Sequence, residues 1–360
     1  MKAGNLKVVV LFIILVALTL GCAQNSGKSG KSEIPVSPSV KLNASYILKK
    51  MNEKCDSLRS YSMTVIRKVG RDENSTKVYQ LYYYVFEKPN KTYLRDIKNG
   101  VLMVSNGKTI WVYNRQHNEV KVLDVNALTR GAREEYEMGL LKAFVNTFSR
   151  NYNSTYAGVV KENGRSFYLL NLKPHKRFTG GGNVSVYVSP DTWLPEKIVY
   201  RGYTMFGPIV TVTLIENVTL NPKVNESMFT FTVPSGAKVI YGTRSYTNVS
   251  EAQKHVNFTI LVPKYAAGMK LDKILVSPEN TVTLFYRNDS NSFIVLETPG
   301  NMTFRPLAER VKINGVTVQK GKTISGGHYF EFAKNGVTIY ILSDNLNTSV
   351  LFEITRSMLE

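Results

Sequence analysis

Few side chains in this sequence of 360 residues are placed to do catalysis or to bind a metal. The run SNGKT at 105–109 ends like a phosphate-binding loop. However, Leu102 stands where the first glycine would be, and a β-like segment follows in place of a helix. The four histidines have no ligand spacing, and neither an H-E-x-x-H motif nor a nucleophile elbow occurs. We therefore expect a protein that is not an enzyme and that uses no cofactor and no metal.

Cys22 is the residue whose surroundings most clearly predict a chemical modification. A short basic start and an apolar run at 8–20 precede it, and that run is shorter than the roughly 20 residues that cross a bilayer. The sequence Thr19-Leu20-Gly21-Cys22 is similar to a lipobox, whose cysteine is acylated after cleavage. Residues 1–21 are thus predicted to be a signal peptide and Cys22 the lipid anchor. The alternative is an uncleaved N-terminal anchor, and both place the chain on the outer face of the cell membrane.

The segment that follows the predicted anchor has the composition of a linker. Residues 22–41 are rich in Ser, Gly, Lys and Pro and contain scarcely any side chain that could enter a core. This composition favours a flexible chain. We expect a tether between the membrane and the folded part.

Glycosylation sequons, Asn-x-Ser/Thr, occur more often than the Ser and Thr content predicts. The excess is typical of an exported glycoprotein. Together with a lipobox, it is more typical of an archaeal cell surface than of a Gram-negative one. The alternative is that Asn and Thr are simply frequent in exposed turns and strands. Sequons begin at Asn43 and Asn248, and the candidate glycosylation sites are Asn74, Asn90, Asn153, Asn183, Asn217, Asn225, Asn257, Asn288, Asn301 and Asn347.

Residues 42–242 are predicted to form the first folded domain, which begins with a helix. Apolar residues recur at helical spacing over 42–59 and place Cys55 on the buried face. A disulfide between Cys22 and Cys55 is an option only if the lipobox interpretation is wrong. A second helix is expected over 127–150, and RFTGGG at 177–182 is expected to be a loop. Short turns separate a series of β-like runs, and this close spacing favours an antiparallel meander. The runs lie at 61–68, 77–86, 91–97, 102–105, 109–113, 119–125, 157–161, 166–172, 184–188, 196–200, 209–217, 229–233 and 238–240.

Residues 249–360 are predicted to form a smaller α+β domain. A short helix is expected over 249–256, strands between Thr259 and Leu342, and a final helix over 349–359. The formal net charge of the chain is +19, yet residues 250–360 hold 12 Lys/Arg against 10 Asp/Glu, so the first domain carries most of the excess. A positive face is attracted to anionic lipid headgroups, and the alternative is a solvated basic surface. Nucleic acid is not an expected partner, because the chain is exported.

Five segments of the first domain resemble, in the same order, the superfamily of LolA-like lipoprotein carriers, which includes LolA, LolB and RseB. They cover the turn after the second strand, an aromatic hairpin, a turn that ends in proline, and the closing part of the domain. These segments are FEKPNK at 86–91, VSNGKTIWVYN at 104–114, SPDTWLP at 189–195, NVTLN at 217–221 and FTFTVPSG at 229–236. Residues 249–360 are similar to a small uncharacterised domain that often follows such carriers, from which no role carries over.

The resemblance implies an α+β fold: a curved, open antiparallel sheet, or incomplete β-barrel, with helices covering its concave face. In that family the cavity between sheet and helices accommodates acyl chains of lipoproteins or lipids, which implies a lipid, an acyl chain or another apolar ligand here. The alternative for these positions is an ordinary filled core. The expected lining residues are Tyr82, Tyr84, Phe86, Trp111, Tyr113, Phe144, Phe148, Tyr168 and Leu170.

Two functions remain open from the sequence. The first is a surface-anchored lipoprotein that binds an apolar ligand without catalysis, and a tethered chain is not expected to shuttle between membranes as soluble carriers do. The second is an envelope sensor or protein-interaction module, similar to RseB, that regulates a membrane partner.

Overall fold

The computed structural model describes residues 42–175, 182–204, 207–300, 302, 308–323 and 326–360. The predicted signal peptide, Cys22, the tether, most of the 177–182 loop and Asn301 lie outside the described residues. The chain divides into two compact units. The first comprises residues up to 121 and 128–239, and the second comprises 122–127 and 240–360.

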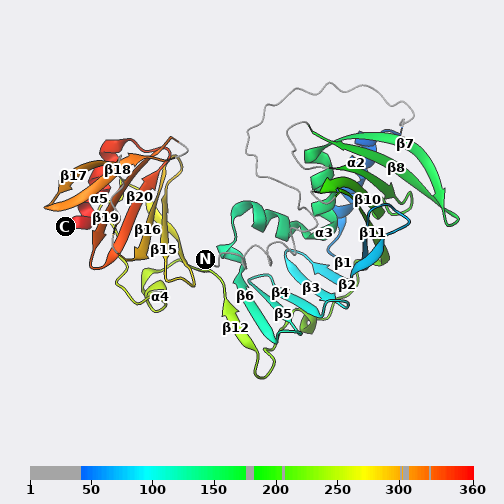
Figure 1. Cartoon of the computed structure of the whole chain (residues 1–360), viewed down its shortest axis with the longest axis horizontal. Coiled ribbons are helices and arrows are strands. Elements are labelled where there is room, and N and C mark those ends of the chain that lie inside the picture. The colour runs from blue at the N-terminus through cyan, green and yellow to red at the C-terminus, as the bar shows by residue number, and fades with distance from the viewer. Residues whose placement is uncertain (1–41, 176–181, 205–206, 301, 303–307, 324–325) are drawn as a thin grey trace. The chain divides into compact units, whose positions relative to one another are not determined.

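One open sheet of 12 strands dominates the first unit (Figure 1). Its strand order is β12-β6-β5-β4-β3-β2-β1-β11-β10-β9-β8-β7, so the first and last strands do not close on each other. Neighbours along the chain pair antiparallel through short turns, as in β2–β3 and β4–β5. The strands are Ser60–Gly70 (β1), Lys77–Glu87 (β2), Lys91–Asp96 (β3), Val101–Asn106 (β4), Thr109–Asn114 (β5), Glu119–Asp124 (β6), Tyr152–Glu162 (β7), Arg165–Pro174 (β8), Asn183–Val188 (β9), Pro195–Thr204 (β10), Gly207–Leu220 (β11) and Lys238–Tyr241 (β12).

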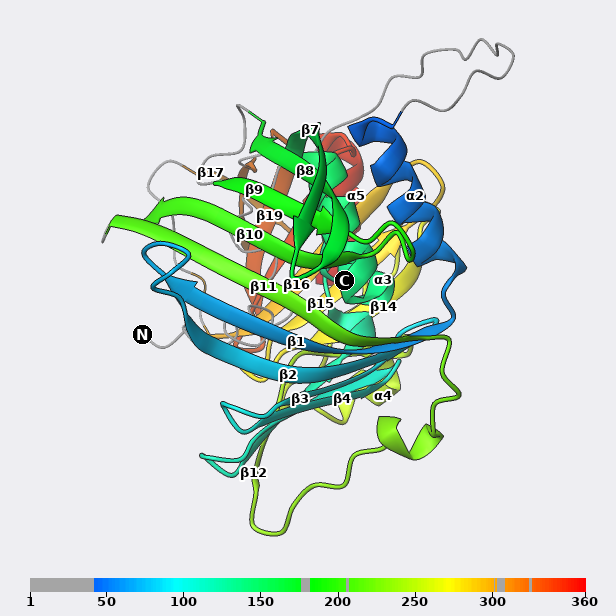
Figure 2. The ribbon, with the colours of Figure 1, turned by 90° about the vertical axis from the view of Figure 1, so that its right-hand side faces the viewer.

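Two helices cover one face of this sheet (Figure 2). Helix α2 (Ala44–Ser57) begins at Asn43, whose side-chain oxygen accepts a hydrogen bond from the Tyr46 N–H at 2.9 Å. Helix α3 (Arg130–Asn151) begins after Thr129. Buried residues of both helices join strand residues from β1, β2 and β8–β11 in a single hydrophobic cluster. Cys55 belongs to it, as the helical spacing predicts, and burial raises the pKa of its thiol to about 12.

The predicted strand at 229–233 is wrong. The chain forms a short 3-10 helix, η2 (Glu226–Phe229), and then runs to β12 without strand pairing. Phe229 is buried, and the ring of Phe231 stacks on Trp111 of β5 with 6.1 Å between centroids. The alternating Phe-Thr-Phe-Thr pattern therefore reflects an extended segment lying on a sheet face, because the period of two is the same for that arrangement and for a paired strand.

The second unit has its own sheet of eight strands, in the order β13-β14-β15-β16-β20-β19-β18-β17. The helices α4 (Val249–Gln253) and α5 (Thr348–Leu359) contribute to its separate hydrophobic cluster, and the 3-10 helix η1 (Val125–Ala127) also lies in this unit. The expected strand at Thr259 is wrong, because residues 259–269 contain no strand. The strands are Arg244–Tyr246 (β13), Lys270–Val276 (β14), Val282–Arg287 (β15), Ser292–Pro299 (β16), Glu309–Ile313 (β17), Val316–Lys322 (β18), His328–Lys334 (β19) and Val337–Ser343 (β20).

Candidate functional site

A layer of aromatic side chains lies on the helix-covered face of the first sheet. Tyr82, Tyr84 and Phe86 alternate along β2 and are all buried. Tyr61 of β1 stands opposite Phe86 in the register, and its ring centroid is 5.4 Å from that of Phe86 and 5.9 Å from that of Tyr84. These four rings form the floor on which helix α3 lies, and we call them the aromatic floor.

Helix α3 is broken directly above this floor. Gly139 has φ 70° and ψ 166°, which interrupts the helical hydrogen bonds in the middle of the element. Two N–H groups beyond the break bond to hydroxyls of the floor: Leu140 N–H donates to Tyr84 at 3.3 Å and Leu141 N–H to Tyr61 at 3.1 Å. The phenol oxygens thus satisfy buried N–H groups that an unbroken helix would pair with its own carbonyls.

Only glycine fits at the break. A Cβ atom at Gly139 would lie 2.7 Å from the Tyr61 hydroxyl oxygen and 3.0 Å from the ring of Phe86. The backbone conformation is also one that residues with a side chain rarely adopt. The close approach of α3 to the floor therefore depends on the missing side chain.

Further contacts hold α3 at both sides of the break. Before it, the Tyr136 hydroxyl donates to the Asn90 carbonyl oxygen in the β2–β3 turn at 2.7 Å. After it, Lys142 Nζ lies 2.7 Å from Asp56 at the end of α2. Each half of the helix is consequently attached to a different part of the unit.

The floor hydroxyls act as neutral hydrogen-bonding groups. Burial raises the pKa of Tyr82 to about 12 and also raises the pKa values of Tyr84 and Tyr61, since the charged phenolate would lose its hydration. They stay protonated at any physiological pH. This arrangement suits hydrogen bonding and apolar packing rather than acid–base chemistry.

The structure brings together seven of the nine predicted lining residues. Six of them are buried in the same cluster, and Tyr168 packs against it partly exposed. Leu170 of β8 is fully buried there, and the rings of Phe144 and Phe148 from α3 stack 6.2 Å apart. The six buried residues are Tyr82, Tyr84, Phe86, Phe144, Phe148 and Leu170.

Trp111 and Tyr113 lie on the opposite face of the sheet. The register passes from Tyr84 through Leu94 and Met103 to Val112, so the even-numbered residues of β5 face the helices. The two aromatic residues face away and contact Phe231 instead, at 6.1 and 6.3 Å between ring centroids. The structure therefore does not join them to the other seven.

Sequence reasoning missed Tyr61 and Gly139. It also missed three of the four rings that form a row beside α2, since only Tyr168 of that row was among the predicted lining residues. Tyr46 of α2, Trp193, Tyr168 and Tyr156 contact one another in that order, with centroid distances of 5.9, 5.4 and 6.2 Å. Trp193 has φ 57°, a rare conformation for a bulky residue, and its N–H donates to the Ser189 carbonyl oxygen at 2.9 Å. A glycine inside an apolar helical run was the one available sign of the break at Gly139.

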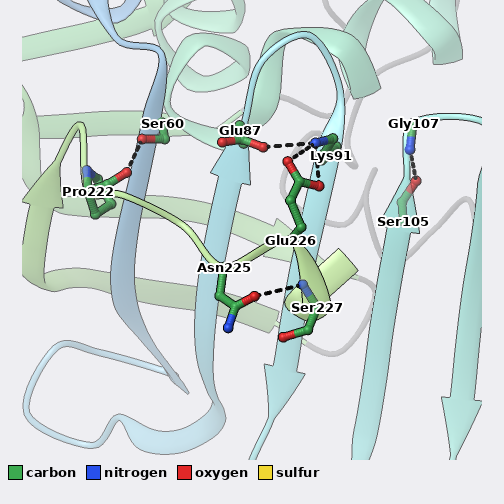
Figure 3. A network of polar contacts seen from close by, with 9 residues as sticks. All are labelled: Ser60, Glu87, Lys91, Ser105, Gly107, Pro222, Asn225, Glu226 and Ser227. Carbon is green, nitrogen blue, oxygen red and sulfur yellow. Dashed lines mark hydrogen bonds and ion pairs between the residues drawn. The ribbon is translucent and has the colours of Figure 1, made fainter. Parts of the chain in front are cut away.

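The segment 221–237, which we call the strap, is fastened across the opposite face (Figure 3). Asn221 accepts a hydrogen bond from the Arg59 N–H at 2.8 Å, and the Ser60 hydroxyl donates to the Pro222 carbonyl oxygen at 2.8 Å. Lys91 Nζ lies 2.6 Å from Glu226 and 3.1 Å from Glu87, beside the ring of the buried Phe229. The strap covers β3 and β4 on the face away from the helices.

Several candidate glycosylation sites already have structural roles for their side chains. Asn225 and Asn347 begin η2 and α5 by accepting backbone N–H groups. Asn90 is half-buried, and its side-chain amide donates to the Gly107 carbonyl oxygen at 3.0 Å. A glycan on the same amide nitrogen would compete with this bond. By contrast, Asn74 is exposed in the β1–β2 turn.

Among the described residues, no group of three or more His, Cys, Asp or Glu side chains is placed to hold a metal ion. In that same part of the chain, no helix has both the length and the apolar character needed to cross a membrane.

No protein-family model matches the chain. An uncharacterized protein of Methanocaldococcus jannaschii is 28% identical over 375 residues, covering 97% of this chain and 97% of that protein, so the alignment spans both units. Solved structures with some likeness include the MucA/MucB complex of Pseudomonas aeruginosa (12% identity, 87% of this chain, 97% of that chain, TM-score 0.29). A LolA superfamily protein from Nitrosomonas europaea is 14% identical, with 53% of this chain and 99% of that chain covered and a TM-score of 0.27. The Mycobacterium tuberculosis lipoprotein LppX is 10% identical, with 51% of this chain and 98% of that chain covered and a TM-score of 0.31. TM-scores of this size, below 0.5, do not establish a shared fold.

Proposed function

We propose that this chain is an exported, non-catalytic protein whose first unit binds an acyl chain or a similar apolar ligand between its sheet and the helices α2 and α3. The observation that carries the proposal is the break of α3 above the aromatic floor. At this point two phenol hydroxyls accept backbone N–H groups of α3, which in an unbroken helix would bond to carbonyl oxygens of the helix itself.

The break allows part of α3 to leave the floor at a moderate cost. Lifting residues 140–151 breaks the bonds to Tyr84 and Tyr61, each worth about 1 kcal/mol net, and separates apolar side chains. A ligand that enters between helix and floor restores the apolar contacts, at about 0.8 kcal/mol for each buried CH₂ group. Burial of an acyl chain of about 12 methylenes would contribute about 10 kcal/mol toward the cost of this opening.

In this proposal the open sheet works as an incomplete barrel, and its helix-covered face receives the ligand. The seven predicted lining residues in or against that cluster would contact the ligand, whereas Trp111 and Tyr113 would not. The sequence resemblance of residues 42–240 to LolA-like carriers supports this assignment.

The anchor belongs to the same proposal. Acylation of Cys22 would hold the protein at the outer face of the cell membrane, with residues 22–41 as the tether and exposed sequons other than Asn74 as sites for glycans. An anchored protein of this kind binds its ligand at one membrane and does not carry it to another.

Native mass spectrometry of the chain purified from its own membrane tests the proposal directly. We expect a bound species with the mass of a lipid or fatty acid, released when the protein unfolds. A fluorescent fatty acid should bind saturably to the delipidated protein. Repeated absence of both signals would reject ligand binding, and a stoichiometric protein partner without any lipid would favour the sensor function in its place.

A matched pair of substitutions on β8 locates the ligand. Leu170 is fully buried on the helix-covered face, and its neighbour Leu169 lies half-buried on the opposite face. Leu170→Trp adds volume under the helices and is expected to weaken fatty-acid binding at least tenfold, whereas Leu169→Trp leaves binding unchanged. Circular dichroism is the control that both variants fold. An equal effect of the two substitutions on binding would place the ligand elsewhere.

A further inference from the structure

The β1–β2 turn, the β3–β4 turn and the last residues of β10 lie at the same end of the first sheet (Figure 2). Arg201 of β10 makes an ion pair with Glu73 in the β1–β2 turn. The side chain of Lys98 in the β3–β4 turn donates to the Val78 carbonyl oxygen of β2, and the Ile97 N–H donates to the Leu81 carbonyl oxygen at 2.8 Å. We call residues 68–79, 95–98 and 201–204 together the turn rim.

The turn rim exposes apolar side chains. Tyr203 is 86% exposed, Ile97 58%, Tyr79 56% and Val78 38%. These are four of the nine large hydrophobic side chains that are exposed in the described part of the chain. Tyrosine and aliphatic residues at the strand ends and in the turn of this rim match the interface of a bilayer, where one end of a side chain meets headgroups and the other meets acyl chains.

Basic residues occur in the same segments as these exposed apolar side chains. The turn rim holds six Lys/Arg and three Asp/Glu. One of the acids, Glu73, pairs with Arg201, and another, Asp96, is buried and accepts the N–H groups of Lys98 and Asn99. The bases without an ion-pair partner among the described residues are Lys68, Arg71, Lys77, Arg95 and Lys98.

We infer that the turn rim docks on the surface of an anionic lipid bilayer. Exposed tyrosines together with bases that have no ion-pair partner complement anionic headgroups over an apolar interior, and each base near such a surface is worth about fivefold in affinity. The length of chain before the first unit is compatible with this position. The 20 residue steps from Cys22 to Leu42 reach at most about 70 Å, which exceeds the roughly 36 Å length of an 11-residue strand such as β1.

Vesicle flotation tests the inference on residues 42–360, which contain every residue of both hydrophobic clusters. We expect this chain to float with vesicles of phosphatidylcholine and phosphatidylglycerol, much less with phosphatidylcholine alone, and less as salt increases. No flotation with the anionic vesicles would overturn the inference. Ligand binding under α3 is a separate measurement, so the failure of one proposal is distinguishable from the failure of the other.

Matched variants assign the binding to the turn rim. Tyr79→Ser with Tyr203→Ser should lower vesicle affinity about tenfold, and Lys77→Glu with Lys98→Glu should lower it more. The control pairs lie outside the turn rim: Tyr241→Ser with Tyr265→Ser, both 49% exposed, and Lys264→Glu with Lys270→Glu, both exposed. Controls that weaken binding as much as the rim variants would contradict docking through the rim.

The sequon at Asn74 gives an independent test, because this residue is exposed in the β1–β2 turn of the rim. A glycan there would hold the rim away from headgroups. Docking therefore requires an unmodified Asn74 in the native protein, measured by mass spectrometry of its peptides. Full occupancy of Asn74 would overturn the inference.

Discussion

Gly139 shows how a single residue decides the geometry of the candidate site. We expect Gly139→Ala to destabilise the first unit by about 2–4 kcal/mol, because the new Cβ would lie 2.7 Å from the Tyr61 hydroxyl oxygen in a conformation that strains alanine. Urea unfolding measures the change. Gly131 in the same helix is the control: a Cβ there meets nothing within 4 Å, so Gly131→Ala should be neutral or slightly stabilising. Equal effects of both would show that the break is not held by the floor.

Glu297 of the second unit is expected to make stability depend on pH. Its carboxylate is fully buried and accepts the Leu261 N–H at 3.1 and 3.2 Å, and burial raises its pKa from 4.5 to about 8. The folded state binds the Glu297 proton more tightly than the unfolded state does. Protonation of Glu297 therefore contributes fully to the free energy of unfolding below pH 4.5, and this contribution is lost as the pH rises to about 8. The total is at most about 5 kcal/mol.

The variant Glu297→Gln should flatten this dependence, because the amide keeps an acceptor for the Leu261 N–H without a titrating group. Denaturant unfolding of both proteins between pH 5 and 9 measures the difference. Glu279→Gln, at an exposed position of the same unit, should keep the slope of the unmodified protein. A slope that survives in Glu297→Gln would assign the pH dependence to another group.

At the scale of elements, the strap shows which interactions hold a segment without strand pairing. Phe229→Ala is expected to cost about 3–4 kcal/mol, because it empties a buried site under the strap. Breaking the ion pair between Lys91 and Glu226 should cost less than about 1 kcal/mol, since Glu226 is 73% exposed. A double-mutant cycle measures the coupling energy of the ion pair, and urea unfolding of Phe229→Ala measures the loss of stability from the emptied site. A coupling larger than the loss at Phe229 would mean that charge, rather than burial, holds the strap.

Elements could be predicted from the sequence where local patterns decide them. Apolar spacing predicted helices α2 and α5 to within a few residues, and Asn-Gly at 106–107 predicted the β4–β5 turn. The same patterns failed at 229–233, where an extended segment lies on a sheet without pairing. They also missed the break in α3, because a helical period continues on both sides of Gly139.

At the scale of the whole molecule, each unit has its own hydrophobic cluster, which predicts separate unfolding. Both tryptophans lie in the first unit, so tryptophan fluorescence follows that unit alone, whereas circular dichroism follows both. Leu284→Ala in the second unit should cost about 3 kcal/mol and leave the fluorescence midpoint unchanged. Leu170→Ala in the first unit should shift that midpoint. One common shift for both variants would show that the units unfold together.

Local chemistry in the sequence determined which segments become helices, strands and turns, because spacing and turn residues act over a few positions. Tertiary structure alone decided which face each strand residue occupies and where α3 breaks. Trp111 and Tyr84 are both aromatic strand residues, yet only the register across β2–β5 places them on opposite faces. The hydroxyls of Tyr61 and Tyr84 meet the broken helix because β1 and β2 bring them under residues about 80 and 56 positions away in the chain. Such contacts depend on pairing between distant segments, which no local pattern encodes.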